Sequence, residues 1–351
     1  MFIYILITIL LTCLSPIRHK NKSVKVVFVC ITSFLTLLAG FRGVGFDYYN
    51  YSVIVYKWNE GPPFEPAFEL LLWLTRPIGN SLALFLPIAL IAVPLKTSFI
   101  YKYSYFPFLS LLIYFHITFM LHDMGQCRYG LAMGLVLFAV SYLIEGKIKN
   151  FFVLVTLAVS FHYSALCVYP IYFINTIKIS KNQFLLCLLS ISILLSLNTI
   201  GFFLWIAEHI PILGVIHRIE VYTSGNPDDV NPNAVGINGS FAIRFLLLLL
   251  LYKLKDSITN TNYNSIFNFY LYGIFLYLIL GSVPEFSYRC SFYFRLLDII
   301  IVPYIIHHAK SNFVRLIVFL SMIIYCSIGT YFGSPDDETF WADYAPYKTC
   351  L

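Results

Sequence analysis

The chain has 351 residues, of which 59% are hydrophobic and only 11% are charged, and its mean hydropathy is +0.79. A soluble domain carries about 25% charged residues, so this composition excludes an ordinary soluble protein and indicates an all-α polytopic membrane protein. The net charge of +6 comes from basic residues dispersed between apolar runs, and we therefore expect no nucleic-acid partner.

Twelve continuous apolar runs are predicted to cross the membrane as helices and to form one integral membrane domain, 1–351. They are 2–15, 24–40, 81–97, 105–121, 129–145, 151–161, 163–176, 184–204, 241–253, 265–281, 290–306 and 313–331. The first has no basic n-region or small-residue cleavage site, so it is interpreted as a retained helix. The two runs around His162 are either short tilted helices or one broken element. The stretch 66–80 is short and bracketed by prolines, so we expect it to be re-entrant or interfacial and not to cross.

The basic residues divide unevenly between the two sets of loops that this topology creates. One set holds twelve of the fourteen lysines, Lys96 and Lys102 among them. The other holds seven of the nine arginines: Arg42, Arg76, Arg128, Arg218, Arg244, Arg289 and Arg295. The positive-inside rule places the lysine-rich set in the cytoplasm. Both termini, the loops 41–66 and 205–240 and the tail 333–351 then face outward.

This division predicts that the arginines bind an anion at the outward face. A topology signal does not distinguish the two basic residues, whereas arginine is the preferred bidentate partner of phosphate oxygens. Arg76 and Arg244 are interpreted as interfacial anchors, and Arg218 lies in the loop 205–240, whose Gly/Asn/Pro-rich composition is typical of a flexible lid. Four arginines remain as candidates for anion binding: Arg42, Arg128, Arg289 and Arg295.

The first outward loop opens with a Gly- and aromatic-rich segment, 41–51, that contains Arg42, Asp47, Tyr48 and Tyr51. Its aromatic rings can stack on sugars, so the segment is interpreted either as a ligand-contacting loop or as an interfacial turn with an Arg–Asp pair. Further along, Glu69 enters the apolar stretch 66–80.

Three other positions place polar groups beside apolar sequence. Arg128 begins a predicted helix, where a guanidinium is costly unless it is paired, faces water or snorkels to the interface. His162 interrupts an apolar hairpin; it is either a hydrogen-bonded structural residue or a neutral imidazole that can accept a proton. Arg289 and Arg295 lie nearly two turns apart on one predicted helix, and we expect both to point into one cavity mouth. Arg295 also shares a face with Asp298, which allows a structural ion pair.

The eight cysteines show no metal-ligand spacing, so we expect no metal site. We also expect no cofactor. Cys127 and Cys290 lie near predicted outward helix ends, and a disulfide between them is left open.

In order and spacing, several of these features resemble the EpsG family of Wzy-type polysaccharide polymerases. They are Arg42 with Gly45, Asp47, Tyr48 and Tyr51; Glu69; Arg128 with Leu131 and Ala132; the run Phe161–Ala165; Arg295 with Pro303; and the tail Tyr344–Tyr347. The resemblance implies a GT-C-like polymerase of O-antigen, capsule or exopolysaccharide in the bacterial inner membrane. It would join undecaprenyl-pyrophosphate-linked repeat units at the periplasmic face by inverting transfer, without metal, and a chain-length regulator is a possible partner.

Under this hypothesis Arg128, Arg289 and Arg295 bind the donor pyrophosphate, and Arg42, Tyr48 and Tyr51 contact sugar or phosphate. His162 is the first candidate for the base that deprotonates the acceptor hydroxyl, with Asp47 and Glu69 as alternatives. Two other functions stay open. An O-antigen ligase uses the same lipid-linked donor. A flippase of that lipid would need charge through the bilayer depth and inverted repeats.

Overall fold

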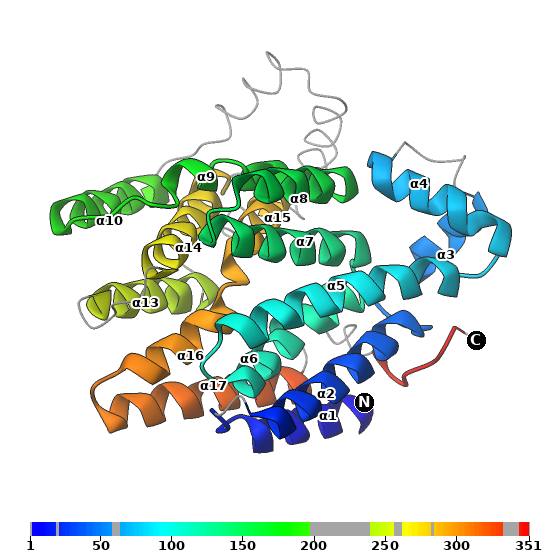
Figure 1. Ribbon diagram of the computed structural model, residues 1–351, viewed down its shortest axis with the longest axis horizontal. Coiled ribbons are helices and arrows are strands. Elements are labelled where there is room, and N and C mark those ends of the chain that lie inside the picture. Colours follow the sequence, from blue (N-terminus) through cyan, green and yellow to red (C-terminus); the bar gives the residue numbers. More distant parts are fainter. Residues whose placement is uncertain are drawn as a thin grey trace, which may run out of the picture. The chain divides into compact units, whose positions relative to one another are not determined.

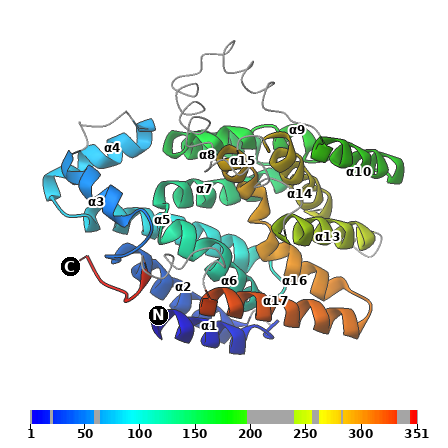
Figure 2. The same ribbon diagram turned by 180° about the vertical axis from the view of Figure 1, so that it is seen from behind.

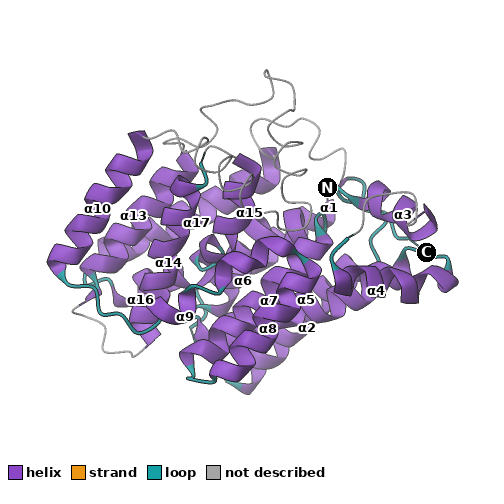
Figure 3. Ribbon diagram, turned by 90° about the horizontal axis from the view of Figure 1, so that it is seen from above, coloured by secondary structure: helices purple, strands orange, loops and turns teal. Residues whose placement is uncertain are grey.

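The computed structural model describes residues 2–18, 21–57, 64–196, 239–255, 262–281, 284–332 and 344–350. These residues form helices joined by short loops, together with one isolated β-bridge between Arg42 and Thr349 (Figures 1 and 3). The chain divides into two compact units: residues 1–169 with 298–351, and residues 170–297. The predicted loop 205–240 lies almost wholly outside the described residues, as do Arg218 and most of the tail 333–351.

Unit 1, residues 1–169 and 298–351, contains ten α-helices among its described residues. They are α1 (Phe2–Leu14), α2 (Lys22–Gly40), α3 (Tyr48–Lys57), α4 (Pro66–Thr75), α5 (Leu82–Tyr103), α6 (Pro107–Tyr114), α7 (Cys127–Ile144), α8 (Ile148–Phe161), α16 (Asp298–His308) and α17 (Asn312–Phe332). A π-helix, Phe115–Asp123, continues α6, and 3-10 turns follow α4 at Arg76–Ile78 and α8 at Tyr163–Val168.

Helix α7 lies at the centre of unit 1, where it packs against α5 on one side and α8 on the other. Most of its residues are buried, as expected for a helix that is apolar on every face. Gly134 allows the close approach of α5, because a Cβ there would lie 3.0 Å from the carbonyl oxygen of Ala92. On the other side of the unit, α1 packs against α6 and α17 (Figure 2).

The helices of unit 1 give it two chemically different ends. The first, here called the Arg42 end, holds the end of α2 and the starts of α5 and α7, because Arg42 contacts both Phe85 and Gly125. The second, the Lys102 end, holds the end of α5 and the turn after α7, where Glu145 pairs with Lys102 and Lys147. The assignment of the two ends to the two sides of a membrane stays a prediction.

The segment 41–81 leaves α2 and enters α5 at the same end of the unit. Tyr48, at the start of α3, lies 3.4 Å from Ser81, just before α5, measured between their hydroxyl oxygens. Between them α4 has only ten residues and exposes Leu70, Trp73 and Leu74. A membrane crossing needs about 20 residues. The chain therefore returns to the same end of unit 1, and the interpretation of 66–80 as re-entrant or interfacial stays a prediction.

Four segments among the described residues are long and apolar enough to cross a membrane: Lys22–Gly40, Leu82–Tyr103, Cys127–Ile144 and Phe286–His308. Further apolar helices have 10–17 residues. The architecture is that of a polytopic membrane protein, while the number of twelve spans stays a prediction. The run 163–176 is not one α-helix: Tyr163–Val168 is 3-10 helical and only Ile171–Ile174 is α-helical. Of the two alternatives for the runs around His162, the structure shows one broken element and not two short tilted helices.

Unit 2, residues 170–297, contains α9 (Ile171–Ile174), α10 (Lys181–Ser196), α13 (Gly239–Lys253), α14 (Asn262–Ile279) and α15 (Pro284–Arg295). Helix α14 is its centre and contacts each of the other four. Gly273 is required where α14 meets α15, because a Cβ at this position would overlap the Cβ of Phe294. The predicted run 290–306 is interrupted at Leu296–Leu297, which separates α15 from α16. Cys127 and Cys290 are both buried, one in each unit, and the disulfide between them stays open.

Candidate functional site

The Arg42 side chain binds the backbone between the π-helix and α7. Arg42 is fully buried, and its Nη1 donates a hydrogen bond to the carbonyl oxygen of Asp123. Its Nη2 donates to the carbonyl oxygen of Gly125 at 3.3 Å, and its Cζ lies 4.4 Å from the centre of the Phe85 ring. The guanidinium therefore joins the loop after α2 to the turn that precedes α7.

The C-terminal tail lies alongside the same loop. The Gly43 amide donates to the carbonyl of Lys348 at 2.6 Å, and the Cys350 amide donates to that of Phe41 at 3.1 Å. The Tyr4 hydroxyl of α1 donates to the carbonyl of Tyr344 at 3.0 Å. The start of α1 and the tail 344–350 thus both contact the Arg42 end.

The loop after α2 requires glycine at position 45, for its backbone conformation and for its close packing. The φ of Gly45 is +125°, and a Cβ there would overlap the carbonyl oxygen of Met124, just before Gly125. We expect Gly45→Ala to destabilise the protein by more than about 1 kcal/mol, because the backbone must move away from the turn that Arg42 holds. The measurement is thermal unfolding of the purified protein in detergent.

Gly79→Ala is the matched control, because Gly79 also has a positive φ, +64°, but no heavy atom lies within 4 Å of a Cβ placed there. Only the conformational cost then remains, about 1 kcal/mol. Equal losses of stability in the two variants would show that the close approach of Gly45 to Met124 is unimportant.

A buried ion pair lies beside the Arg42 turn. The Nζ of Lys96, in α5, lies 2.5 Å from Oδ1 of Asp123, and the Tyr114 hydroxyl donates to Oδ2 at 2.7 Å. The side chains of Lys96 and Asp123 are 0% and 2% exposed. The prediction that Lys96 lies in a cytoplasmic loop is therefore wrong, because α5 continues seven residues beyond it and turns it into the core.

Arg128, in the first turn of α7, is held by a carboxylate and three aromatic rings. Its Nη1 lies 2.6 Å from Oε2 of Glu65, the residue before α4. Its Cζ lies 4.7 Å from the centre of the Phe64 ring, 5.0 Å from that of Phe68 and 5.9 Å from that of Tyr51. Such stacking on aromatic faces adds to the ion pair. The guanidinium ties α7 to α3 and α4.

Tyr51 accepts a hydrogen bond from Nε of Arg128 at 3.2 Å. Burial raises the pKa of the Tyr51 phenol well above its ordinary value of 10. The hydroxyl therefore keeps its proton at physiological pH. It accepts from Arg128 and retains a hydrogen to donate to another oxygen.

His162 lies next to this cluster, at the break after α8. It is buried, its Nδ1 is 2.7 Å from the Ser164 hydroxyl, and its ring centre is 4.9 Å from that of Tyr129, the residue after Arg128. The backbone amide of Tyr163, the next residue, donates to Oε1 of Glu65 at 3.4 Å. The break in α8 therefore brings His162 to the cluster around Arg128.

The remaining candidates from the first loop have local roles in this arrangement. Tyr48 stacks on Phe85 with 5.5 Å between ring centres, and the carbonyl of Asp47 accepts from the Tyr51 amide at 3.0 Å. Oε1 of Glu69 accepts a hydrogen bond from the Phe64 amide at 2.8 Å, so this carboxylate holds the backbone that leads into α4.

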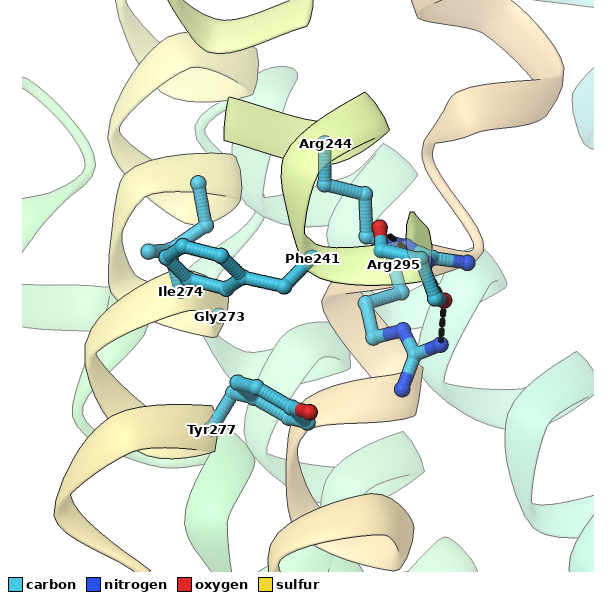
Figure 4. A pocket seen from close by; sticks show the side chains of 7 residues that line it. Phe241, Arg244, Gly273, Ile274, Tyr277 and Arg295 are labelled. Carbon is cyan, nitrogen blue, oxygen red and sulfur yellow. Dashed lines mark hydrogen bonds between the residues drawn. The ribbon is translucent and has the colours of Figure 1, made fainter. Parts of the chain in front are cut away.

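A second group of arginines lies in unit 2, where a pocket opens between α13, α14 and α15 (Figure 4). Arg295, the last residue of α15, donates from Nη2 to the Ser240 hydroxyl at 3.0 Å. Arg244, four residues after Ser240 on α13, donates from Nη1 to the same hydroxyl and to the Ser240 carbonyl at 2.8 Å. Arg289 also lies on α15, but it is not among the residues described as lining this pocket.

A family model named EpsG family matches residues 25–349. The chain belongs to the EpsG family. EpsG-like proteins are relatives of the Wzy-type polymerases, so membership indicates in general a membrane protein of polysaccharide biosynthesis with polymerase activity. No curated protein and no solved structure matches the chain.

Two features of this EpsG family protein escaped sequence reasoning. Arg244 was interpreted as an interfacial anchor, yet it is buried and shares Ser240 with Arg295. The signal was the spacing of Ser240 and Arg244, which are four residues apart and therefore face one side of a helix. The signal for the burial of Lys96 was the return of apolar residues, Phe99 and Ile100, one turn after it.

Proposed function

We propose that this protein is a polysaccharide polymerase that joins undecaprenyl-pyrophosphate-linked repeat units at the periplasmic face of a bacterial inner membrane. The observation that carries the proposal is membership of the EpsG family over residues 25–349. The chain would have a GT-C-like fold with twelve spans. A hydroxyl of the acceptor attacks the anomeric carbon of the donor, the bond from that carbon to the pyrophosphate breaks, and the configuration inverts.

The electrostatic requirement of this reaction is to stabilise negative charge on the departing lipid pyrophosphate. We assign this role to arginine side chains, which bind phosphate oxygens in a bidentate manner. The pocket of unit 2 supports the assignment, because Arg295 lies there with a second guanidinium. Arg289, on the same helix, is the further candidate.

We assign Arg42 and Arg128 mainly a structural role. Both guanidiniums already bind protein groups, the turn before α7 and Glu65 respectively. They fix the positions of Tyr48, Tyr51 and the start of α7, which we assign to contact with the sugar rings. Direct contact of Arg128 with the pyrophosphate is a further proposal, which the polymer ladder of a variant with restored stability tests.

His162 is the proposed base that takes the proton of the acceptor hydroxyl. It is buried beside a charged cluster, and its contact with Ser164 orients the imidazole ring. Asp47 and Glu69 are the alternative bases. The contact of Glu69 with the Phe64 amide favours a structural role for that residue.

We expect His162→Ala to lower the rate of polymerisation at least about 100-fold, which is the usual contribution of a general base. The assay supplies synthetic lipid-linked repeat units to the reconstituted protein and follows the polymer ladder. His308→Ala, at the end of α16, is the matched control and should leave the ladder unchanged. A normal ladder from folded His162→Ala would exclude this residue as the base.

The same assay separates polymerisation from the two other functions. A ligase would transfer polymer to lipid A core instead of extending it, so adding that acceptor distinguishes ligation from polymerisation. A flippase would move the lipid-linked repeat across a vesicle membrane without joining two repeats. Extension of the ladder by the wild-type protein supports the proposal, and its absence with movement or ligation contradicts it.

A further inference from the structure

The first turn of α13 presents a hydroxyl and a guanidinium on one face. Ser240 is the second residue of the helix, and Arg244 follows one turn later. The Arg244 side chain folds back toward the start of the helix and donates from Nη1 to both the hydroxyl and the carbonyl of Ser240. This guanidinium therefore lies close to the helix N-terminus, which is the positive end of the helix dipole.

The end of α15 brings a second guanidinium to the same hydroxyl. Nη2 of Arg295 lies 3.0 Å from Oγ of Ser240, so one neutral oxygen accepts from two cationic groups (Figure 4). Two guanidiniums that converge on one oxygen can also bind the oxygens of one phosphate group, for which arginine is the preferred partner. An anion in the place of the hydroxyl would attract both.

The walls of the pocket restrict solvent and fix Arg295. Phe241 and Tyr277 stack with 5.8 Å between ring centres, and the Cζ of Arg295 lies 5.7 Å from the centre of the Tyr277 ring. Gly273 lines the pocket from α14, and the cavity volume is about 10 Å³, so a phosphate group fits only when the Ser240 hydroxyl moves aside. Interactions between charges are stronger where water is excluded, so an anion bound here gains more than at an open surface.

We propose that Ser240, Arg244 and Arg295 form the binding site for one phosphate group of a polyprenyl diphosphate. The identity of the lipid rests on the proposed function. The new element is that Arg244 and Ser240 bind the phosphate together with Arg295. The Ser240 hydroxyl occupies the place of a phosphate oxygen until the ligand arrives. The two guanidiniums then exchange the hydroxyl for phosphate oxygens, each with two parallel N–H groups.

The test measures binding of farnesyl diphosphate to the purified full-length protein in detergent. Arg244→Ala should weaken binding about tenfold or more, the usual effect of losing a hydrogen bond to a charged group. Arg244→Lys keeps the positive charge but loses the two parallel N–H donors of the guanidinium. It should weaken binding less than Arg244→Ala does. Arg76→Ala, which removes an exposed arginine after α4, is the matched control and should bind as the wild type does.

Two further probes identify the source of the phosphate. Inorganic pyrophosphate should compete with farnesyl diphosphate, whereas phosphatidylglycerol in nanodiscs should not. Competition by phosphatidylglycerol alone would overturn the assignment in favour of a headgroup site. Unchanged affinity in folded Arg244→Ala, or in Arg244→Lys and Ser240→Ala if the alanine variant does not fold, would also overturn it.

The polymer assay separates failure of the site from failure of the proposed function. If wild-type protein binds farnesyl diphosphate through Arg244 but never extends lipid-linked repeats, the site stands and the polymerase proposal fails. If Arg244→Ala extends repeats at the wild-type rate, the polymerase proposal stands and the site fails.

Discussion

Replacing Lys96 by methionine is expected to leave little folded protein in the membrane. The Asp123 carboxylate would keep the hydrogen bond from Tyr114 but lose its cation in a region where both partners are at most 2% exposed. Removing one partner of a buried ion pair costs about 3–5 kcal/mol, a large part of the 5–15 kcal/mol that stabilises a typical domain. The measurement is the amount of folded protein after extraction, with its thermal unfolding temperature in detergent.

Lys102→Met provides the matched control, because Lys102 lies on the same helix and is also paired to a carboxylate, but its side chain is 50% exposed. A surface pair contributes only about 0–1 kcal/mol, so this variant should unfold close to the wild type. The double variant Lys96→Met with Asp123→Asn should recover much of the loss, since asparagine is neutral and still accepts from Tyr114. Equal stability of Lys96→Met and Lys102→Met would contradict the argument.

The sequence predicted the helices of unit 1 well where an apolar run begins and ends with a clear change of composition. The run 129–145 corresponds to α7, Cys127–Ile144, and the stretch 66–80 to α4 with its 3-10 turn. The predicted run 81–97 ends too early, because a lysine usually marks the end of a membrane helix. Helix α5 continues to Tyr103, since a carboxylate from the π-helix neutralises Lys96.

The partners of each arginine could not be predicted from the sequence. Arg42 binds backbone carbonyls, and any residue supplies a carbonyl, so no pattern of side chains could indicate this contact. Arg128 binds a glutamate 63 residues away, at the start of a short helix whose position depends on aromatic packing. The sharing of Ser240 by Arg244 and Arg295 requires two helices to meet, which hydropathy does not encode.

Breaking the pair of Glu65 and Arg128 is expected to have the second large effect. The Glu65 side chain is 1% exposed and that of Arg128 is 17% exposed. Arg128→Met would leave the carboxylate buried against aromatic rings, at a cost of about 3 kcal/mol or more. Arg128→Lys should be intermediate, because a single ammonium cannot reproduce the fork that reaches both Glu65 and Tyr51. Thermal unfolding in detergent measures both.

The double variant Arg128→Met with Glu65→Gln separates a structural role of Arg128 from contact with substrate. Glutamine still accepts from the Tyr163 amide, and no charge remains buried, so stability should recover beyond the sum of the two single effects. If Arg128 only ties α7 to α3 and α4, the polymer ladder should return together with stability. If Arg128 also contacts the lipid pyrophosphate, the recovered protein should still fail to extend the ladder. A single variant Arg128→Met that unfolds at the wild-type temperature would show that the ion pair does not stabilise the fold.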